Sequence, residues 1–420
     1  MHFWARERLD TQPKQRKAQE ALILVGGISK KSENKSTYDW AFEKRIWSHL
    51  ETVRMSVTEF PKHSKRAGEV FRATSSIGAM YFDHGFYSQA ENLFQWSFEG
   101  QQKLLGEDHL DTLDTVHNMA NVLNSQGEYS KALEWYQRAL DGRENTLGKD
   151  HPSTLGTVGN MAIVFKRQGE HSKALEWYQR ALDGREKTLK DHPSTLGTVG
   201  NMANVFYSQG EYSKALEWYR RALEGHEKTL GKDHPSTLHA VNNMANVFYR
   251  QGEYSKAVEW YQRALDGREK TFGKDHPSTL GTVGNMANVF CSQGEYSKAL
   301  EWYQRALDGR EKTFGKDHPS TLSTVGNMAN VFCSQGEYSK ALEWYQRALD
   351  GHEKTLGKDH PSTLHAVNNM ANVFYRQGEY SKAVEWYQRA LDGREKTLGK
   401  DHPDTIASAK FVESLIPLCT

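Results

Sequence analysis

Apolar residues recur at helical spacing in two neighbouring segments, and the chain repeats this pair of segments many times. In residues 193–208, PSTLGTVGNMANVFYS, they fall along one face of an amphipathic helix. This stripe consists of Leu196, Val199, Met202, Ala203 and Phe206. Residues 211–230 carry a second stripe, made of Tyr212, Ala215, Leu216, Tyr219, Ala222 and Leu223. The pattern therefore predicts two helices, each with one apolar face.

The residues at the ends of these segments are typical of helix ends. Pro193 suits the first helical position, and either Asp191 or His192 before it can cap the helix. Gly210 stands where the first helix must end, and the glycine of the recurrent TLGKDHP motif ends the second helix. Each copy is therefore expected to be a helical hairpin.

The copies follow one another at a nearly constant period. An Asp-His pair marks each copy, with the histidine at positions 109, 151, 192, 234, 276, 318, 360 and 402. The spacing is 42 residues, except for 41 between His151 and His192, where TLKDHP lacks the glycine of TLGKDHP. One hairpin cannot bury its own apolar faces, but stacked hairpins can. We therefore predict an all-α solenoid.

Each copy also carries a recurrent set of small and aromatic residues. The motif Met-Ala-x-x-Phe precedes Ala-x-x-x-Tyr-x-x-Ala, as in Met202, Ala203, Phe206, Ala215, Tyr219 and Ala222. This motif resembles the tetratricopeptide signature. The 42-residue period and the REKTLGKDHP ending are similar to the kinesin light chain subclass of that family. The resemblance implies a right-handed tetratricopeptide solenoid of about eight helical hairpins, whose first helices line a concave groove for protein partners.

The repeats divide the chain into a non-repeating N-terminal segment, residues 1–65, and an array, residues 66–417. The array is expected to start with a degenerate unit at 66–106, which contains SSIGAMYFDHGFYSQAENLFQWSF. Strong units are then expected at 109–150, 151–191, 192–233, 234–275, 276–317, 318–359 and 360–401. The stretch PDTIASAKFVESLI predicts a lone capping helix within 403–417.

The N-terminal segment predicts three helices, at about 2–9, 14–30 and 38–56. Within it, HFWARERL and WAFEKRIWSHL resemble the segment that joins the nucleotide-binding NB-ARC module to tetratricopeptide arrays in fungal NLR-like proteins. The stretch VGGISKKS lacks the Gly-Lys-Ser/Thr ending of a P-loop, so we expect neither nucleotide binding nor another cofactor. No heptad pattern is sustained, which counts against the coiled coil of a true kinesin light chain.

Two functions remain open at this point. The leading hypothesis is an interaction scaffold that forms the sensor or recognition array of an NLR-like receptor. The alternative is a cargo adaptor of kinesin light chain type. No Ser-His-Asp, Cys-His or paired-carboxylate arrangement stands out from the repeats, so no enzymatic activity is expected.

Composition and charge narrow the classes of partner. The 420 residues are 37% hydrophobic and 25% charged, and the formal net charge of +1 favours neither nucleic acid nor a membrane surface. No apolar run is long enough to span a membrane, and MHFWARERLD lacks the apolar core of a signal peptide. Only three cysteines are present, which favours a reducing compartment. A cytoplasmic location is therefore expected.

A nearly fixed asparagine column is the first candidate for peptide binding. Its members lie opposite the apolar stripe and are Asn121, Asn204, Asn246, Asn288, Asn330 and Asn372, with Ile163 as the exception. A carboxamide can donate to a peptide carbonyl and accept from a peptide N–H, so the column can hold an extended backbone. The family resemblance implies the same role, but amides bonded to their own neighbours would explain the column equally well.

Second helices are almost invariant, whereas the exposed face of the first helices varies from copy to copy. One varied site holds Lys166, Tyr207, Tyr249 and Tyr375, the next holds Arg167, Arg250 and Arg376, and a third holds His239 and His365. Drift of solvent-facing residues could produce this variation, but other exposed sites, such as Lys214 and Glu217, are the same in every strong copy. We interpret the varied sites as a groove for an extended and acidic protein segment.

Glycine pairs at 156/159, 197/200 and 281/284 lie on the same face of the first helices. Each glycine costs roughly 1 kcal/mol in a helix interior. Their effect would be a bare stretch of groove wall that a partner can approach closely.

Two further columns have simpler explanations. A tryptophan column consists of Trp135, Trp177, Trp218, Trp260, Trp302, Trp344 and Trp386. Stacking of nucleic-acid bases would need basic groove residues between them, so packing between adjacent units is the better interpretation. The Asp-His pairs lack a close Cys or His partner within each unit, so helix capping is expected and a metal site is not.

Overall fold

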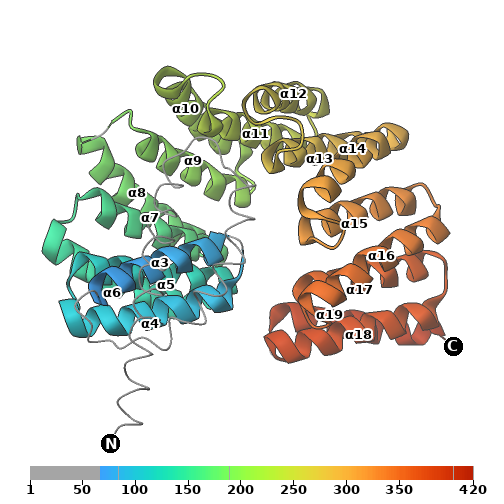
Figure 1. Ribbon diagram of the computed structural model, residues 1–420. Coiled ribbons are helices and arrows are strands. Elements are labelled where there is room, and N and C mark those ends of the chain that lie inside the picture. Colours follow the sequence, from blue (N-terminus) through green and yellow to red (C-terminus); the bar gives the residue numbers. More distant parts are fainter. Residues whose placement is uncertain (1–66, 84, 189, 401, 420) are drawn as a thin grey trace, which may run out of the picture. The chain divides into compact units, whose positions relative to one another are not determined.

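The computed structural model describes residues 67–83, 85–188, 190–400 and 402–419 (Figure 1). Over these ranges the chain forms seventeen α-helices, α3 to α19, and one short 3-10 helix, without a strand. The three helices predicted for the N-terminal segment 1–65 lie outside the described residues.

Two compact units, residues 1–222 and 223–420, divide the chain, and the boundary falls within α10 (Tyr212–Leu230). The first unit contains α3 (Ala67–Asp83), α4 (Tyr87–Leu105), α5 (Leu110–Gln126), α6 (Tyr129–Leu147), α7 (Pro152–Arg167), α8 (His171–Thr188) and α9 (Pro193–Ser208). The second contains α11 (Pro235–Arg250), α12 (Tyr254–Phe272), α13 (Pro277–Ser292), α14 (Tyr296–Phe314), α15 (Pro319–Ser334), α16 (Tyr338–Leu356), α17 (Pro361–Arg376), α18 (Tyr380–Leu398), α19 (Pro403–Leu415) and the 3-10 helix Ile416–Cys419.

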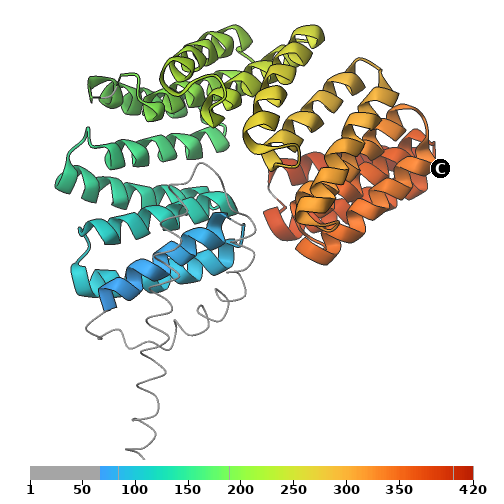
Figure 2. The ribbon, with the colours of Figure 1, turned by 45° about the horizontal axis from the view of Figure 1, so that its top comes forward.

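Within each unit, consecutive helices pair as hairpins, and the second helix of a hairpin packs against the first helix of the next (Figures 1 and 2). The apolar stripes read from the sequence form the buried core between them. In the second unit, Val283, Met286 and Ala287 of α13 pack in one cluster with Tyr303 and Leu307 of α14. The predicted all-α fold of eight hairpins with a closing helix is therefore confirmed.

Glycines with positive φ end the helices where the sequence predicted. Gly210 adopts a φ of 78°, a conformation that glycine enters without strain. Its N–H donates to Tyr207 O, and the next residue, Glu211, donates to Phe206 O. These bonds satisfy the last carbonyls of α9 and turn the chain into α10.

In seven of the eight Asp-His pairs the histidine caps the helix that follows it. His192 Nδ1 accepts from the backbone N–H of Ser194 at 3.2 Å. The same bond is made by His109, His151, His234, His276, His318 and His360. In five pairs the preceding aspartate instead forms an ion pair with a lysine, as Asp233 does with Lys270. The capping interpretation is confirmed, and of the two candidate caps the histidine makes the bond.

A buried glycine lets each second helix approach its first helix closely. At Gly267 of α12, a Cβ would lie 2.3 Å from Cδ2 of Leu238 in α11. The leucine side chain thus fills the space that the missing side chain leaves. The same glycine–leucine contact recurs at Gly309 with Leu280 and at Gly351 with Leu322.

Helices long and apolar enough to cross a membrane do not occur in the part of the chain that the structure describes.

Cys291 of α13 and Cys333 of α15 occupy the same site in adjacent hairpins, and both are free thiols. Burial raises the pKa of each thiol, which makes both less reactive. Packed helices lie roughly 8–10 Å apart, whereas a disulfide needs a Cα separation below about 7 Å. We therefore expect non-reducing mass spectrometry of freshly purified protein to find both thiols free. A peptide linked through Cys291 and Cys333 would contradict this stacking.

Candidate binding surface on the first helices

Each unit has a cleft on its first helices. In the second unit, α11, α13 and α15 line a cleft of about 300 Å³, and Gly281 and Gly284 of α13 form part of its wall. In the first unit, α5, α7 and α9 line a similar cleft of about 290 Å³ around Gly156 and Gly159 of α7. No atom lies within 4 Å of the position that a Cβ would take at these glycines, so the wall is bare there.

A buried tyrosine of the second helix bonds each asparagine of the column. The tyrosine hydroxyl donates to the asparagine Oδ1 in the pairs Tyr136–Asn121, Tyr219–Asn204, Tyr261–Asn246, Tyr303–Asn288, Tyr345–Asn330 and Tyr387–Asn372. Burial raises the pKa of Tyr303, and it raises the pKa of Tyr387 to about 12, so these hydroxyls stay protonated and can donate. Because the oxygen of each amide is bound, its NH₂ group is left to donate on the other side.

Few acceptors compete for these NH₂ groups. Within the described ranges, those of Asn288, Asn330 and Asn372 have no protein acceptor. Asn246 Nδ2 lies 3.5 Å from Asn243 Oδ1, at the limit of a hydrogen bond. Asn121 and Asn204 make similarly long contacts, with Nδ2 at 3.4 Å from Asn118 Oδ1 and at 3.5 Å from Asn201 Oδ1. Each asparagine is therefore bonded to a tyrosine through its oxygen, and the nitrogens of Asn288, Asn330 and Asn372 remain available to a ligand.

The cationic residues lie at the C-terminal ends of the first helices and contact the neighbouring first helix. Arg167 Nη1 of α7 donates to the carbonyl of Asn124 in α5 at 2.9 Å. Burial and the charge of Arg167 lower the pKa of Lys166 beside it. In the second unit, Arg376 of α17 hydrogen-bonds the thiol of Cys333 in α15 and partly offsets the effect of burial on its pKa.

The predicted aromatic residues lie at the same helix ends. The hydroxyls of Tyr249 in α11 and Ser292 in α13 are hydrogen-bonded at 2.9 Å. The ring of Tyr207 lies 6.0 Å from that of Tyr212. Tyr375, which is 39% exposed, contacts Tyr380 and Phe411 with ring centroids at 5.5 and 6.5 Å. Tyrosine and arginine sites thus lie at the C-terminal ends of the first helices, where Arg250 is also exposed.

His239 and His365 lie at the opposite ends of their helices, α11 and α17. The rings are exposed and face the asparagine one turn later, at 3.4 Å from Asn243 and 3.3 Å from Asn369. The histidine sites therefore lie near the N-terminal end of the first helix, and the tyrosine and arginine sites lie at its C-terminal end. The asparagine column lies between them in sequence.

The sequence analysis missed a column of cations that reaches this surface from the second helices. Arg268 of α12 and Arg310 of α14 line the cleft of the second unit, and Arg143 of α6 and Arg185 of α8 line that of the first. Arg268 Nη1 donates to the Ser278 carbonyl at 2.9 Å and the Thr282 hydroxyl at 2.6 Å, both on the next first helix. The guanidinium groups thus pass between adjacent first helices.

Two sites that change together in the sequence could have revealed this arginine column. Each of the four arginines is followed by a hairpin whose first helix carries a threonine at an equivalent site. The threonine hydroxyl accepts a hydrogen bond from the arginine, and the four threonines are Thr157, Thr198, Thr282 and Thr324. At two junctions the arginine is replaced by His226 or His352, and the threonine is replaced by Ala240 or Ala366. Loss of the donor and of its acceptor together indicates that the two sites touch.

The tryptophan column packs on the side of the second helices. Trp177 lies 6.0 Å from Phe165, and the guanidinium of Arg180 stacks over it at 5.5 Å. Arg180 also pairs with Glu144 of the preceding hairpin. Trp344 contacts the apolar clusters of two successive hairpins. These contacts confirm that the tryptophan column packs neighbouring hairpins together.

Comparison with known families decides the class of the protein. The tetratricopeptide repeat profile matches residues 69–145, 113–187, 194–270, 239–311, 275–354, 320–396 and 364–411, which cover well over half of the chain. The chain belongs to the tetratricopeptide repeat family.

Solved tetratricopeptide structures share this fold. The apo form of the quorum sensor NprR from B. thuringiensis has a TM-score of 0.58 and 15% identity, and the alignment covers 91% of this chain and 98% of NprR. A Rap protein complexed with competence and sporulation factor has a TM-score of 0.57 and 15% identity, with 92% and 98% covered. A kinesin light chain protein of Podosopora anserina with nearly identical TPR-like repeats is 26% identical, with a TM-score of 0.43 and 49% and 98% covered. No curated protein matches the chain.

Membership in this family indicates what such folds typically do. Tetratricopeptide solenoids are typically non-catalytic scaffolds that bind proteins or peptides on extended surfaces. The asparagines of the tyrosine–asparagine pairs lie on the first helices of this array, and first helices supply most of the lining of the clefts.

Proposed function

We propose that this tetratricopeptide array is a non-catalytic scaffold whose first helices bind an extended segment of a protein partner. The observation that carries the proposal is the tyrosine–asparagine pair, which recurs in six hairpins. The tyrosine holds each amide in one orientation before any ligand arrives. A preorganised donor loses little freedom on binding, so each NH₂ can bond a passing peptide carbonyl at low entropic cost.

The charge of the varied sites supports an acidic partner. Arg250 and Arg376 lie at the C-terminal ends of first helices of the second unit, where both are exposed, and Arg167 occupies the same site in a first helix of the first unit. Guanidinium groups form strong, charge-assisted bonds with carboxylates. The asparagines would then hold the backbone of the segment while the arginines select acidic side chains.

Two double variants test this proposal. Asn246→Ala/Asn372→Ala removes two amides, and we expect about a fivefold loss of affinity per lost bond, because a net hydrogen bond contributes about 1 kcal/mol. Arg250→Ala/Arg376→Ala should weaken the binding of acidic peptides and reduce its sensitivity to salt. Fluorescence anisotropy with partner peptides selected on a peptide array measures both effects.

The control for these variants is Gln262→Ala/Gln388→Ala, which changes exposed residues that bond only Asp266 and Asp392 of their own second helices. This variant should bind as the unchanged protein does. If all four proteins bound the same peptides equally well and salt had no effect, the tryptophan-bearing side of the second helices would become the candidate surface.

The finer biological setting rests on the N-terminal segment. We propose that residues 1–65 form a helical segment next to an array at 66–417, and that the protein is the sensor array of an NLR-like receptor. HFWARERL and WAFEKRIWSHL support this assignment. The REKTLGKDHP endings favour the alternative, a kinesin light chain-type cargo adaptor. Genomic sequence upstream of the codon for Met1 discriminates between them, because an in-frame NB-ARC segment supports the receptor and a heptad coiled coil supports the adaptor.

A further inference from the structure

The cleft of the second unit contains two guanidinium groups and no carboxylate. Its lining includes Arg268 and Arg310, the bare wall of Gly281 and Gly284, and no Asp or Glu. Neither arginine has an ion-pair partner among the residues that the structure describes. Arg268 is only 7% exposed, and burial lowers its pKa to about 10, so it still carries its charge at neutral pH. A buried, unpaired charge is costly, and an incoming anion would relieve that cost.

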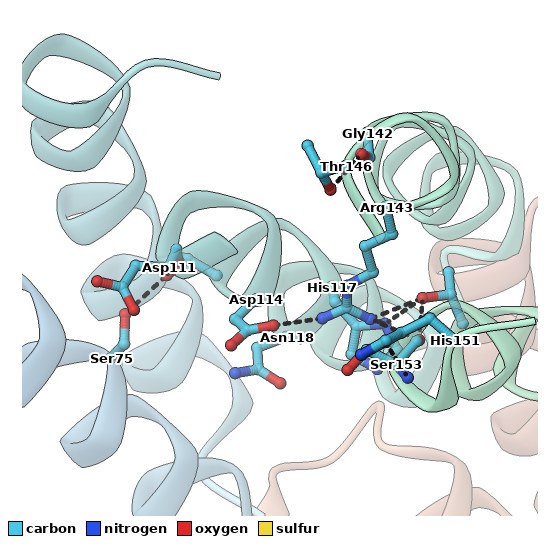
Figure 3. Close-up of polar contacts among 12 residues, drawn as sticks. Ser75, Asp111, Asp114, His117, Asn118, Gly142, Arg143, Thr146, His151 and Ser153 are labelled. Carbon is cyan, nitrogen blue, oxygen red and sulfur yellow. Dashed lines mark hydrogen bonds and ion pairs between the residues drawn. The ribbon is translucent and has the colours of Figure 1, made fainter. Parts of the chain in front are cut away.

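The first hairpin of the strong repeats shows how a carboxylate binds such an arginine (Figure 3). Arg143 uses Nη1 to hold the Ser153 carbonyl and the Thr157 hydroxyl of the next first helix. Its Nη2 forms an ion pair with the carboxylate of Asp114 on α5. In the fourth strong repeat hairpin after it, the same three sites hold Arg310, Thr324 and, in place of the aspartate, Gly281.

The guanidinium of Arg310 is held in the same way as that of Arg143. Arg310 Nη1 donates to the Ser320 carbonyl at 3.0 Å and to the Thr324 hydroxyl at 2.5 Å. Its other nitrogens have no protein partner among the described residues. Arg310 is therefore preorganised for a carboxylate that its own hairpin does not supply.

We propose that the cleft at Gly281 binds a carboxylate side chain of the partner segment in the place that Asp114 fills in the earlier hairpin. This inference rests on the proposed function and names the anion site within the groove. Arg310 and Arg268 would flank the carboxylate, and the amides of Asn285 and Asn327 line the same cleft. The bare glycine wall would let the partner backbone approach, and Asn288, whose NH₂ is available, lies in the same lining.

The corresponding cleft in the first unit should bind an anion less well. Gly156 and Gly159 form its wall, and Arg143 and Arg185 line it. Arg143 is already neutralised by Asp114, so of these two arginines only Arg185 is without an ion-pair partner among the described residues. The same ligand therefore meets one unpaired charge there and two in the second unit.

A substitution that supplies the missing carboxylate tests the inference. Gly281→Asp places a carboxylate at the site of Asp114, and nothing within 4 Å opposes the new Cβ. Gly281→Asn is the matched control, because it has the same shape without the charge. The probe is a fluorescein-labelled peptide of alternating glutamate and serine, and its glutamine analogue is the uncharged reference.

We expect the glutamate peptide to bind more tightly than the glutamine peptide. Gly281→Asp should weaken glutamate binding about tenfold, because the new aspartate occupies Arg310, whereas Gly281→Asn should change it less than about twofold. Gly156→Asp should have the smaller effect of the two aspartate variants. Equal affinities of the Gly281→Asp and Gly281→Asn proteins, or equal binding of the two peptides, would overturn the inference. A phosphoserine peptide that binds more tightly still, with the same sensitivity to Gly281→Asp, would identify phosphate as the source of the oxyanion.

The outcomes separate this inference from the proposed function. If Asn246→Ala/Asn372→Ala weakens the glutamate peptide but Gly281→Asp does not, the groove binds peptide and the anion lies elsewhere. If none of these variants changes binding, both the groove and its anion site are wrong.

Discussion

Lowering the pH from about 7.5 to about 5.5 should destabilise the folded array, chiefly through its buried histidines. Burial and the neighbouring charge of Arg143 lower the pKa of His117 from 6.5 to about 3. Burial also lowers the pKa of five other histidines, namely His226, His276, His318, His352 and His360. The rings of His276, His318 and His360 are also helix caps whose Nδ1 must accept a hydrogen bond, which a protonated ring cannot do.

The loss of stability at low pH follows from the difference in proton binding between the unfolded and the folded chain. In the unfolded chain these histidines take up a proton near pH 6.5, whereas in the folded chain they stay neutral to lower pH. Their contribution to stability is therefore fully present above pH 6.5 and is lost as the pH falls below it. His117 alone should cost about 1.4 kcal/mol between the two conditions, and the other five act in the same direction. This range lies above the titration of ordinary carboxylates.

Thermal unfolding followed by circular dichroism at the two pH values measures the effect. The expected fall of the midpoint is at least about 2 °C. His117→Asn is the control, because Asn242 occupies the equivalent site in the second unit and accepts from Thr282 there at 3.2 Å. This variant should show a smaller fall. Equal stability at the two pH values would mean that these histidines are protonated in the folded state without cost.

The repeat pattern was sufficient to predict the helices. The apolar spacing, the proline and the glycines around 193–210 gave a first helix at 193–208, and α9 has these bounds. The second helix, expected at 211–230, is α10 at Tyr212–Leu230. These features depend on residues close in sequence, which is why a single copy is enough to predict them.

Contacts between hairpins were harder to predict. The sequence left Asp191 and His192 as equal caps, and only the position of the imidazole Nδ1 shows that the histidine bonds Ser194. The arginine column was not foreseen, because Arg268 belongs to a second helix and its position in that helix does not show that it reaches the next hairpin. Its partner, Thr282, is 14 residues away on α13. Contacts of this kind depend on how neighbouring helices stack rather than on the periodicity of either helix.

The bonds of the asparagine column were also not predictable from the sequence. The sequence indicated that Asn288 lies on the exposed face of its helix, but it gave no sign that Tyr303, fifteen residues later, bonds its oxygen. Periodicity alone places Tyr219, the equivalent residue of an earlier hairpin, in the apolar stripe of its second helix. The ring of Tyr303 is buried in the same stripe of α14, and its hydroxyl extends beyond it to the amide. An amphipathic side chain can thus belong to the core and to the candidate site at once.

Glycine-to-alanine substitutions should have opposite effects on stability at two places in the second unit, the cleft wall and the contact between α11 and α12. Gly281→Ala/Gly284→Ala should raise the free energy of unfolding by about 2 kcal/mol, because each alanine gains about 1 kcal/mol of helix propensity. No atom within 4 Å obstructs either new methyl group. Gly267→Ala gains the same propensity, but its Cβ would lie 2.3 Å from Leu238 Cδ2. Overpacking in a core costs about 1–3 kcal/mol, so the net effect at this site should be a loss of about 1 kcal/mol.

Urea unfolding followed by circular dichroism at constant pH compares the three proteins, and the difference between the two variants should be about 3 kcal/mol. Leu238→Val combined with Gly267→Ala is the control for the clash, because the shorter side chain makes room for the new methyl group. This pair should lose less stability than the sum of its two single substitutions. If Gly267→Ala were as stabilising as the double variant, Leu238 would rotate aside freely, and the glycine would not be needed for the close packing of α11 and α12. If Gly281→Ala/Gly284→Ala were destabilising instead, the bare wall of the cleft would be required by the fold itself rather than left open for a ligand.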